Sequence, residues 1–332
     1  MSNIKIGVIG SNSFSGASFV DFALTNNLSV IGMSRSKQPN DVFLPYSNNI
    51  HKKEKFKFHQ LDLNNDLNGI INLIKQEKLE YIFNFAAQSM VAESWEFPEQ
   101  WFTTNVVSTT KFFNKLKDFK FIKKYIHVTT PEVYGSCSGY ITEDTPYNPS
   151  TPYAASRAAG DMSLKTFVDN YNFPAVSTRA ANVYGYGQQL YRIIPRTILY
   201  IRQGKKLQLH GGGLSERSFI HMNDVSDATL KIALKGTIGE TYHISTKSSI
   251  TIKGLVNLIC DKMNAEFDKH VNIVGDRPGK DAAYLLASEK LRKSLAWKDS
   301  VTLDQGINEV IDWVDCNMDI LEREKDYYIH KP

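Results

Sequence analysis

The segment IKIGVIGSNSFSG, residues 4–16, decides the fold. Its first part, Ile4–Gly10, is a short run rich in β-branched residues that ends in glycine, which is typical of a buried parallel strand. Gly10 suits a tight turn after the strand, and Gly16 suits close packing of the following helix. Ser13 replaces the middle glycine of the usual dinucleotide-binding pattern, and its hydroxyl could bond a phosphate oxygen. Taken alone, this loop is as consistent with an ordinary turn as with a dinucleotide-binding site.

The alternation of strands and helices extends this first unit. Strand-like segments cover 28–36, 56–63, 80–87, 124–130 and 174–185; helical ones cover 16–27, 67–78, 98–117 and the stretch from Tyr153. Such alternation predicts an α/β protein with a doubly wound parallel sheet, the Rossmann type. After about Tyr184 the pattern becomes mixed, which predicts a smaller α/β substrate domain. We expect a nucleotide-binding domain over 1–182 with a return of 219–246, a second domain over 183–332, and a cleft between them.

Composition excludes several classes of protein. The net charge of +4 is small and the basic residues are spread along the 332 residues, so we expect no nucleic-acid partner. No apolar run is long enough to cross a bilayer, and no signal-peptide pattern is present. Three distant cysteines, Cys137, Cys260 and Cys316, fit the cytoplasm better than a disulfide framework, and the histidines form no metal-ligand spacing.

Two positions bear on the choice of cofactor. NAD enzymes commonly carry an acid after the second strand, where this chain reads Ser34-Arg35-Ser36. Arginine and hydroxyl groups would accept a 2′-phosphate, so NADP is favoured over NAD; a solvated surface arginine is the alternative. Asp62, after the third strand, is placed to bond the adenine amine, although aspartate at a strand end is also ordinary turn chemistry.

Four further segments follow in order on this scaffold. They are FNFAAQS (83–89), TTNVVST (103–109), TTPEVYG (129–135) and TPYAASRAAGD (151–161). Singly, Asn105, Glu132 and Tyr153 could be a helix-surface amide, a loop carboxylate and an amphipathic helix residue. Tyr153 and Arg157 stand at the i, i+4 spacing where many oxidoreductases carry Tyr and Lys, and this spacing puts both on one helix face.

In this order the segments resemble the extended short-chain dehydrogenases that act on nucleotide sugars, most of all the 4,6-dehydratases of dTDP-glucose and GDP-mannose. The resemblance covers nearly the whole chain and continues through TRAANVYG (178–185), IIPRTI (193–198), ERSFIHMNDV (216–225) and GDRPGKD (275–281). It implies a nucleoside-diphosphate sugar as substrate. It also implies a homodimer built from the helix over 98–117 and the helix that carries Met162, Leu164 and Phe167.

The resemblance implies a role for each catalytic residue. Tyr153, as phenolate, would take the proton of the C4 hydroxyl, Thr130 would bond the O4 oxygen, and Glu132 would remove the C5 proton before water leaves C6. Free tyrosine titrates near pH 10, so a phenolate needs a nearby cation, which we expect Arg157 to supply in place of lysine. The aspartate that dTDP-glucose enzymes carry before the glutamate is Pro131 here. The GDP-mannose type also lacks that aspartate yet keeps the glutamate.

The full set of expected contacts can be given by ligand. The cofactor is assigned to Gly10, Ser13, Phe14, Gly16, Arg35, Asp62, Leu63, Ala86, Ala87, Gln88, Asn105, Thr129, Tyr153 and Arg157. The substrate is assigned to Ser89, Thr130, Asn182, Arg192, Arg217 and Arg277.

Three rival interpretations remain open. A 4-epimerase shares the fold and Tyr153 but needs no base at C5, so Glu132 argues against it. A decarboxylase of UDP-glucuronate also carries a glutamate in this motif and needs a cation for the substrate carboxylate. From a different class, an NADP-binding sensor without turnover would explain Ser13 and Arg157, but it gives no reason for Thr130, Glu132 and Tyr153 to occur together.

Overall fold

The computed structural model describes residues 4–275 and 285–331 of the chain. Its centre is a seven-stranded sheet of order β12-β7-β5-β4-β1-β2-β3, in which each neighbouring pair is parallel. The predicted doubly wound parallel sheet is therefore confirmed. The strands are β1 (Lys5–Ile9), β2 (Ser29–Ser34), β3 (Phe56–Gln60), β4 (Tyr81–Asn84), β5 (Lys124–Val128), β7 (Ala175–Ala180) and β12 (Thr241–Ile244).

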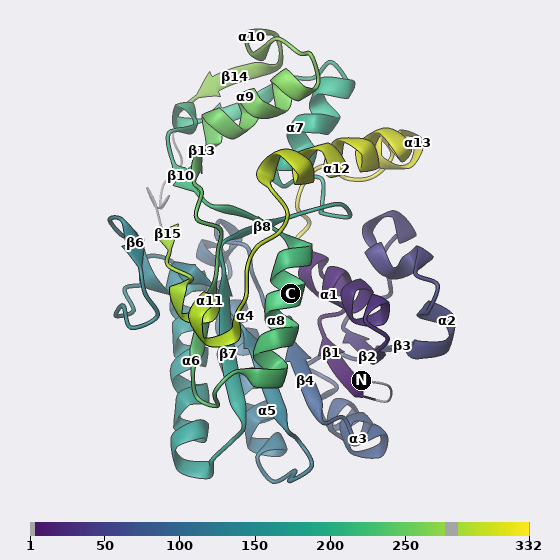
Figure 1. The fold of residues 1–332 in the computed structure, drawn as a ribbon, viewed down its shortest axis with the longest axis vertical. Coiled ribbons are helices and arrows are strands. Elements are labelled where there is room, and N and C mark those ends of the chain that lie inside the picture. Colours follow the sequence, from purple (N-terminus) through teal and green to yellow (C-terminus); the bar gives the residue numbers. More distant parts are fainter. Residues whose placement is uncertain (1–3, 276–284, 332) are drawn as a thin grey trace.

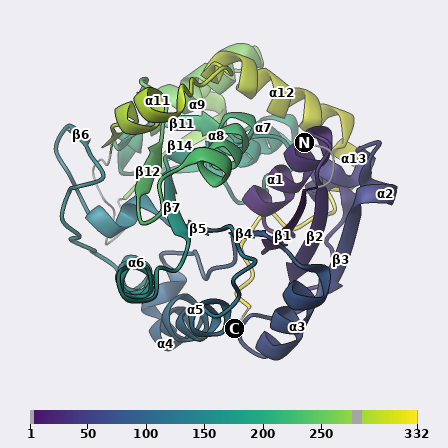
Figure 2. The same ribbon diagram turned by 60° about the horizontal axis from the view of Figure 1, so that its bottom comes forward.

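Helices cover both faces of this sheet, as Figure 2 shows. On one face an apolar cluster joins the sheet to α1 (Phe14–Thr25), α8 (Met222–Lys235) and α11 (Glu289–Leu295). On the other face a second cluster joins it to α3 (Leu67–Glu77), α5 (Thr109–Leu116) and α6 (Pro152–Tyr171). Burial on both faces explains why the central strands β1 and β2 are mostly apolar along their length, whereas the edge strand β3 alternates.

A second group of elements stands beyond the carboxyl ends of the strands, at the top of Figure 1. Its core packs α7 (Ile193–Arg202), α9 (Ile252–Lys262) and α12 (Leu303–Cys316) together. Beside them, β9 (Leu207–His210) pairs in parallel with β14 (Val271–Val274). Thr241–Ile244 returns to the main sheet beside β7, whereas the division of the chain at residue 182 stays a prediction.

The remaining elements are short. They are η1 (Asp41–Phe43), η2 (Pro45–Asn48), α2 (Lys52–Lys55), η3 (Glu93–Trp95), α4 (Pro98–Phe102), η4 (Thr103–Ser108), η5 (Pro131–Tyr134), β6 (Tyr140–Ile141), β8 (Asn182–Tyr184), η6 (Gly211–Gly213), β10 (Glu216–Arg217), β11 (Phe219–His221), β13 (Ile250–Thr251), α10 (Phe267–His270), β15 (Leu285–Leu286) and α13 (Met318–Leu321). Across residues 4–275 and 285–331, no helix has the length and apolarity needed to cross a membrane.

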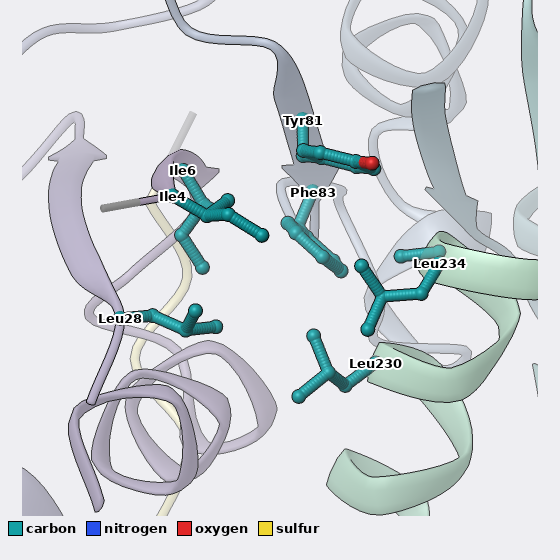
Figure 3. Close-up of a pocket in the computed structure, with 8 residues that line it drawn as sticks. Ile4, Ile6, Leu28, Tyr81, Phe83, Leu230 and Leu234 are labelled. Atoms are coloured by element: carbon teal, nitrogen blue, oxygen red, sulfur yellow. The ribbon is translucent and has the colours of Figure 1, made fainter. Parts of the chain in front are cut away.

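One small pocket lies inside the core, between β1, β4 and α8 (Figure 3). Aliphatic and aromatic side chains line it, and the hydroxyl of Tyr81 is the one side-chain polar atom among them. The lining residues are Ile4, Ile6, Leu28, Tyr81, Phe83, Leu230, Ala233 and Leu234. The pocket is a packing gap far from the predicted chemistry, so the candidate site must be built from the residues at the strand ends.

Candidate active site

The turn between β1 and α1 forms the first wall of the site. Gly10 has φ of +82°, and a Cβ atom there would come within 2.7 Å of the Ala86 backbone nitrogen. A Cβ at Gly16 would come within 2.1 Å of the Gly10 carbonyl oxygen. Both positions therefore require glycine, and their close packing holds the turn against the end of β4.

Ser13 caps helix α1. Its hydroxyl donates to the Gly10 carbonyl at 2.7 Å and accepts the Gly16 N–H at 3.1 Å. Because the hydroxyl hydrogen is engaged inside the turn, it does not face a ligand in this structure. The first N–H groups of α1, at Phe14 and Ser15, are the ones that helix geometry leaves for an anion.

Asp62, which was expected to bond the adenine amine, accepts hydrogen bonds within its own turn. One carboxylate oxygen accepts the Asn64 N–H at 2.9 Å and the other accepts the Asn65 amide at 2.7 Å. Both oxygens thus stabilise the turn after β3, and Leu63 beside them is buried. Arg35, after β2, donates to the backbone carbonyl of Lys331 at 3.0 Å.

Asn105 links the end of β4 to helix α6. Its side chain accepts the Gln88 N–H and donates to the Gln88 carbonyl, both at 3.0 Å, and it donates to the Ser156 hydroxyl at 2.9 Å. Asn105 lies in the π-helical segment η4, and a Cβ at Gly160 would come within 2.6 Å of its carbonyl oxygen. The amide therefore fixes the loop of Ala86, Ala87 and Gln88 relative to α6, whereas the neighbouring Ser89 is exposed.

The residues predicted to be catalytic lie at the starts of two helical segments. Tyr153 is in the first turn of α6, after the cap Thr151, whose hydroxyl accepts the Ala154 N–H at 3.1 Å. Thr130 caps η5 by accepting the Glu132 N–H at 3.3 Å. Pro131 occupies the first position of η5, where its missing N–H costs nothing.

The pKa of Tyr153 responds to the side chains around the phenol. Burial is the largest influence and raises the pKa of Tyr153, and the Glu132 carboxylate raises it further. Arg157, a hydrogen bond with Thr130, and Arg192 act in the opposite direction but do not outweigh the first two. The predicted effect of Arg157 thus has the right sign, yet the pKa of the phenol stays above its ordinary value in the chain alone.

Arg157 is 4% exposed and donates through one terminal nitrogen to the carbonyl of Val128, at the end of β5. Its Nε atom is buried and has no hydrogen-bond partner among the described residues. A buried donor without a partner is costly, so a ligand acceptor is expected there. The ribose hydroxyls of a nicotinamide nucleotide fit this requirement, since they are acceptors that would lie beside Tyr153.

A buried ion pair, Asp161 with Arg179, contacts the segment that carries Thr129 and Glu132. Arg179 Nη2 lies 2.7 Å from Asp161 Oδ2, and Thr129 donates to the same oxygen at 3.1 Å. Arg179 also donates to the hydroxyls of Tyr134 and Tyr147. Because Tyr134 ends η5, the pair ties α6 and β7 to the segment that carries Glu132.

Three of the predicted substrate residues, Asn182, Arg192 and Arg217, follow β7 in the chain, whereas Ser89 and Thr130 follow β4 and β5. Asn182 begins β8 and Arg217 ends β10, where it donates to the Glu216 carbonyl at 2.8 Å. Arg192 is exposed at the N-cap of α7, with its guanidinium 5.4 Å from the Tyr191 ring centre. Arg277 lies outside the described residues.

Comparison with known proteins assigns the family. The family model described as GDP-mannose 4,6-dehydratase matches residues 8–310. The chain belongs to this family. Its members are extended short-chain dehydrogenases, so the resemblance found in the sequence is confirmed.

Several similar proteins and solved structures are named as dTDP-glucose 4,6-dehydratases. The dTDP-D-glucose 4,6-dehydratase of Mus musculus is 34% identical over 270 residues, 80% of this chain and 75% of that protein. The dTDP-glucose 4,6-dehydratase of Xanthomonas campestris is 29% identical and covers 92% of both chains. The solved dTDP-glucose 4,6-dehydratase of Streptomyces venezuelae, with NAD and TYD bound, has a TM-score of 0.87 at 27% identity, covering 95% of this chain and 98% of that one.

Two features of the site were not predicted from the sequence: the ion pair of Asp161 with Arg179 and the contacts of residues 326–331. Asp161 and Arg179 lie in two of the motifs, TPYAASRAAGD and TRAANVYG, but a buried pair of charges is only visible once α6 and β7 are placed side by side. No pattern assigned a role to residues 326–331, which contact Arg35 and Gln88.

Proposed function

We propose that the chain is a nucleotide-sugar 4,6-dehydratase, a lyase that converts a nucleoside-diphosphate hexose into its 4-keto-6-deoxy derivative. The observation that carries the proposal is the proximity of Tyr153, at the start of α6, to Thr130 and Glu132, at the start of η5, both of which act on the pKa of the phenol. A 4-epimerase has no use for a carboxylate at this place, whereas elimination across C5 and C6 requires a base.

The reaction proceeds through these side chains in order. Tyr153 removes the proton from the C4 hydroxyl while Thr130 holds the oxygen that becomes a carbonyl. A nicotinamide nucleotide held beside Tyr153 and Arg157 would supply hydride chemistry, with oxidation at C4 and reduction at C6 and no net change in the cofactor. Oxidation at C4 acidifies the C5 proton, which Glu132 removes.

Glu132 also assists the departure of water. Pro131 carries no acidic group, so the carboxylic acid formed on Glu132 delivers its proton to the leaving C6 oxygen. The C5 proton and the C6 hydroxyl thus leave together as one water, and Glu132 returns to its starting state. When C6 is reduced, C5 takes up one proton from solvent-exchanged groups, which balances the proton that Tyr153 removed from the C4 hydroxyl. Tyr153 starts the cycle as a phenolate because Arg157, the start of α6 and the cationic nicotinamide all favour its charged form.

The cofactor is proposed to be NADP in preference to NAD. Arg35 and Ser36 replace the acid that NAD enzymes commonly place after the second strand. Solved relatives from Streptomyces venezuelae and Bacillus anthracis contain NAD, so the preference is a feature proposed for this chain. Arg192 and Arg217, with Asn182, are proposed to hold the diphosphate of the sugar nucleotide.

We further propose that the chain is a cytoplasmic homodimer. Phe102, Val107 and Met162 are exposed apolar residues on α4, η4 and α6, the helices expected to pair. Leu164, in contrast, packs into the core and does not face a partner. The three cysteines are free, which fits a reducing compartment.

The Glu132→Gln variant tests the proposal. The amide cannot accept the C5 proton, so a sugar nucleotide should still reduce the bound cofactor, seen as nicotinamide absorbance, but no water should be lost. Tyr153→Phe should abolish both signals, and Glu54→Gln, an exposed carboxylate on α2, should behave like the wild type. Unimpaired loss of water by Glu132→Gln would refute the role of Glu132.

A further inference from the structure

Behind the segment that carries Glu132, four polar side chains form a continuous buried network. They are Tyr134 at the end of η5, His243 on β12, Arg179 on β7 and Asp161 on α6. None of the four is assigned to the cofactor or to the substrate. Because burying polar groups costs free energy even when they are paired, the network calls for a role of its own.

The hydrogen bonds around Tyr134 run in one direction. Burial, the largest influence, lowers the pKa of His243 to about 3, so its imidazole is neutral at neutral pH. The Nδ1 atom lies 3.2 Å from the Ala287 carbonyl oxygen, which can only accept, so Nδ1 carries the proton. The Nε2 atom, 2.7 Å from the Tyr134 hydroxyl, is then the acceptor. The Tyr134 hydroxyl therefore donates to His243 and accepts from Arg179, whose guanidinium can only donate.

The ring of Tyr134 is held as closely as its hydroxyl. The guanidinium carbon of Arg179 lies 4.8 Å from the ring centre, and the His243 ring meets it edge-on at 5.4 Å with an interplanar angle of 79°. Burial raises the pKa of Tyr134 to about 12, so the phenol keeps the proton that it donates. Contacts at both the ring and the hydroxyl leave this side chain a single position.

The position of Tyr134 determines that of Glu132, two residues earlier in the same short helical turn. The Gly135 N–H closes this turn on the Glu132 carbonyl at 3.1 Å. Pro131, Val133 and Tyr134 are buried, whereas Glu132 is partly exposed. The turn is thus held from its core side, while the Glu132 carboxylate acts on the pKa of Tyr153.

The groups that act at C4 have a different support. Thr129, beside Thr130, donates its N–H to the Thr178 carbonyl at 2.9 Å, which holds it at the ends of β5 and β7. Tyr153 stands in the first turn of α6, which Thr151 caps. Loosening Tyr134 should therefore displace Glu132 more than Thr130 or Tyr153.

We propose that Tyr134, held between His243 and Arg179, is a positioning residue that aims Glu132 at C5 and C6 during elimination. The inference rests on the proposed function, in which Glu132 takes the C5 proton and delivers it to the C6 oxygen. One carboxylate that serves two atoms needs close placement, because small displacements of a reacting group cost much of the rate. The Tyr134 hydroxyl itself exchanges no proton with the substrate.

Tyr134→Phe in the full chain separates elimination from oxidation. It keeps the ring and removes both hydrogen bonds of the hydroxyl. The assay supplies NADP and whichever of GDP-mannose, dTDP-glucose, CDP-glucose and UDP-N-acetylglucosamine the wild type converts. Stopped-flow nicotinamide absorbance follows oxidation at C4, and quenched mass spectrometry follows the loss of water. Water loss should slow about tenfold, the size expected for one buried hydrogen bond, while KM and the rate of nicotinamide reduction stay at wild-type values.

Tyr140→Phe is the matched control, because it also removes one hydroxyl, which donates to the Lys247 carbonyl at 2.9 Å on an exposed side chain. It should leave both steps unchanged. Unchanged water loss in Tyr134→Phe would overturn the proposal. Equal slowing of both steps would also overturn it, because that result indicates a general loss of structure.

Two variants of His243 test the direction of the hydrogen bond. The amide oxygen of His243→Gln can accept from Tyr134 in place of Nε2, so water loss should stay within about twofold of the wild type. His243→Leu offers no acceptor and should slow water loss about as much as Tyr134→Phe, again with nicotinamide reduction unchanged. A loss in His243→Gln as large as that in His243→Leu would contradict the role of the acceptor.

The positioning role and the proposed reaction fail in different ways. A wild type that removes water from none of the sugar nucleotides refutes the proposed function and this inference with it. A wild type that removes water, beside a Tyr134→Phe variant that does so equally fast, refutes the positioning role alone.

Discussion

Replacement of Arg179 by methionine is expected to destabilise the chain by about 3–5 kcal/mol, the usual cost of leaving one member of a buried ion pair unpaired. Arg179 and Asp161 are both almost fully buried, with Nη2 and Oδ2 2.7 Å apart. Methionine keeps the length of the side chain but removes the donors to Asp161, Tyr134 and Tyr147. The carboxylate would then be desolvated without its cation.

The pH dependence of stability gives a second measure of the same pair. Burial alone would raise the pKa of Asp161, but the nearby His127 and the charge of Arg179 outweigh it and hold the pKa at about 2. A shift of about two units corresponds to roughly 2–3 kcal/mol. Because the folded pKa is lowered, this stabilisation is complete above about pH 4 and is lost as the pH falls towards 2.

Thermal unfolding followed by circular dichroism measures the loss. Arg179→Met should lower Tm by roughly 4–7 °C at neutral pH, and Asp161→Asn added to it should recover part of the loss. Lys165→Met, which breaks the exposed pair with Asp169, should change stability by under about 0.5 kcal/mol. A loss below about 1 kcal/mol in Arg179→Met, or no recovery in the double variant, would refute the reasoning.

Three further changes test the site. Gly16→Ala places a Cβ 2.1 Å from the Gly10 carbonyl, so it should abolish cofactor binding measured by fluorescence; unchanged binding would contradict the turn's geometry. Arg157→Met removes a cation that lowers the pKa of Tyr153, so the pH–rate profile should move to higher pH and Arg157→Lys should restore it; an unmoved profile would contradict the role of Arg157. Asp62→Asn should change the cofactor Kd by less than about threefold, because the turn after β3 engages both carboxylate oxygens; a larger loss would indicate direct contact.

The fold was predictable because its signals are local. Strand β1, the turn at Gly10 and the helix that follows are contiguous in the chain, and their residue types determine their conformations. Tyr153 and Arg157 share a helix face by spacing alone. Pro131 fits the start of η5 for a reason that is also local, its missing N–H.

The contacts that could not be predicted from the sequence join residues that are far apart in the chain. Lys331 meets Gln88 across 243 positions, and no periodicity connects the two. The cap formed by Ser13 depends on where its hydroxyl hydrogen points, which composition does not determine. The raised pKa of Tyr153 follows from burial and from Glu132, and both depend on how η5 packs against α6.

The most direct test of the central claim is mass spectrometry of sugar nucleotides after incubation with the protein in heavy water. GDP-mannose, dTDP-glucose, CDP-glucose and UDP-N-acetylglucosamine would each be offered with NADP. The account predicts that one of them loses one water and gains deuterium at C5, because C5 is reprotonated from solvent-exchanged groups after Glu132 has removed its proton. Recovery of all four with unchanged composition and no deuterium would contradict the assignment as a 4,6-dehydratase of these sugars.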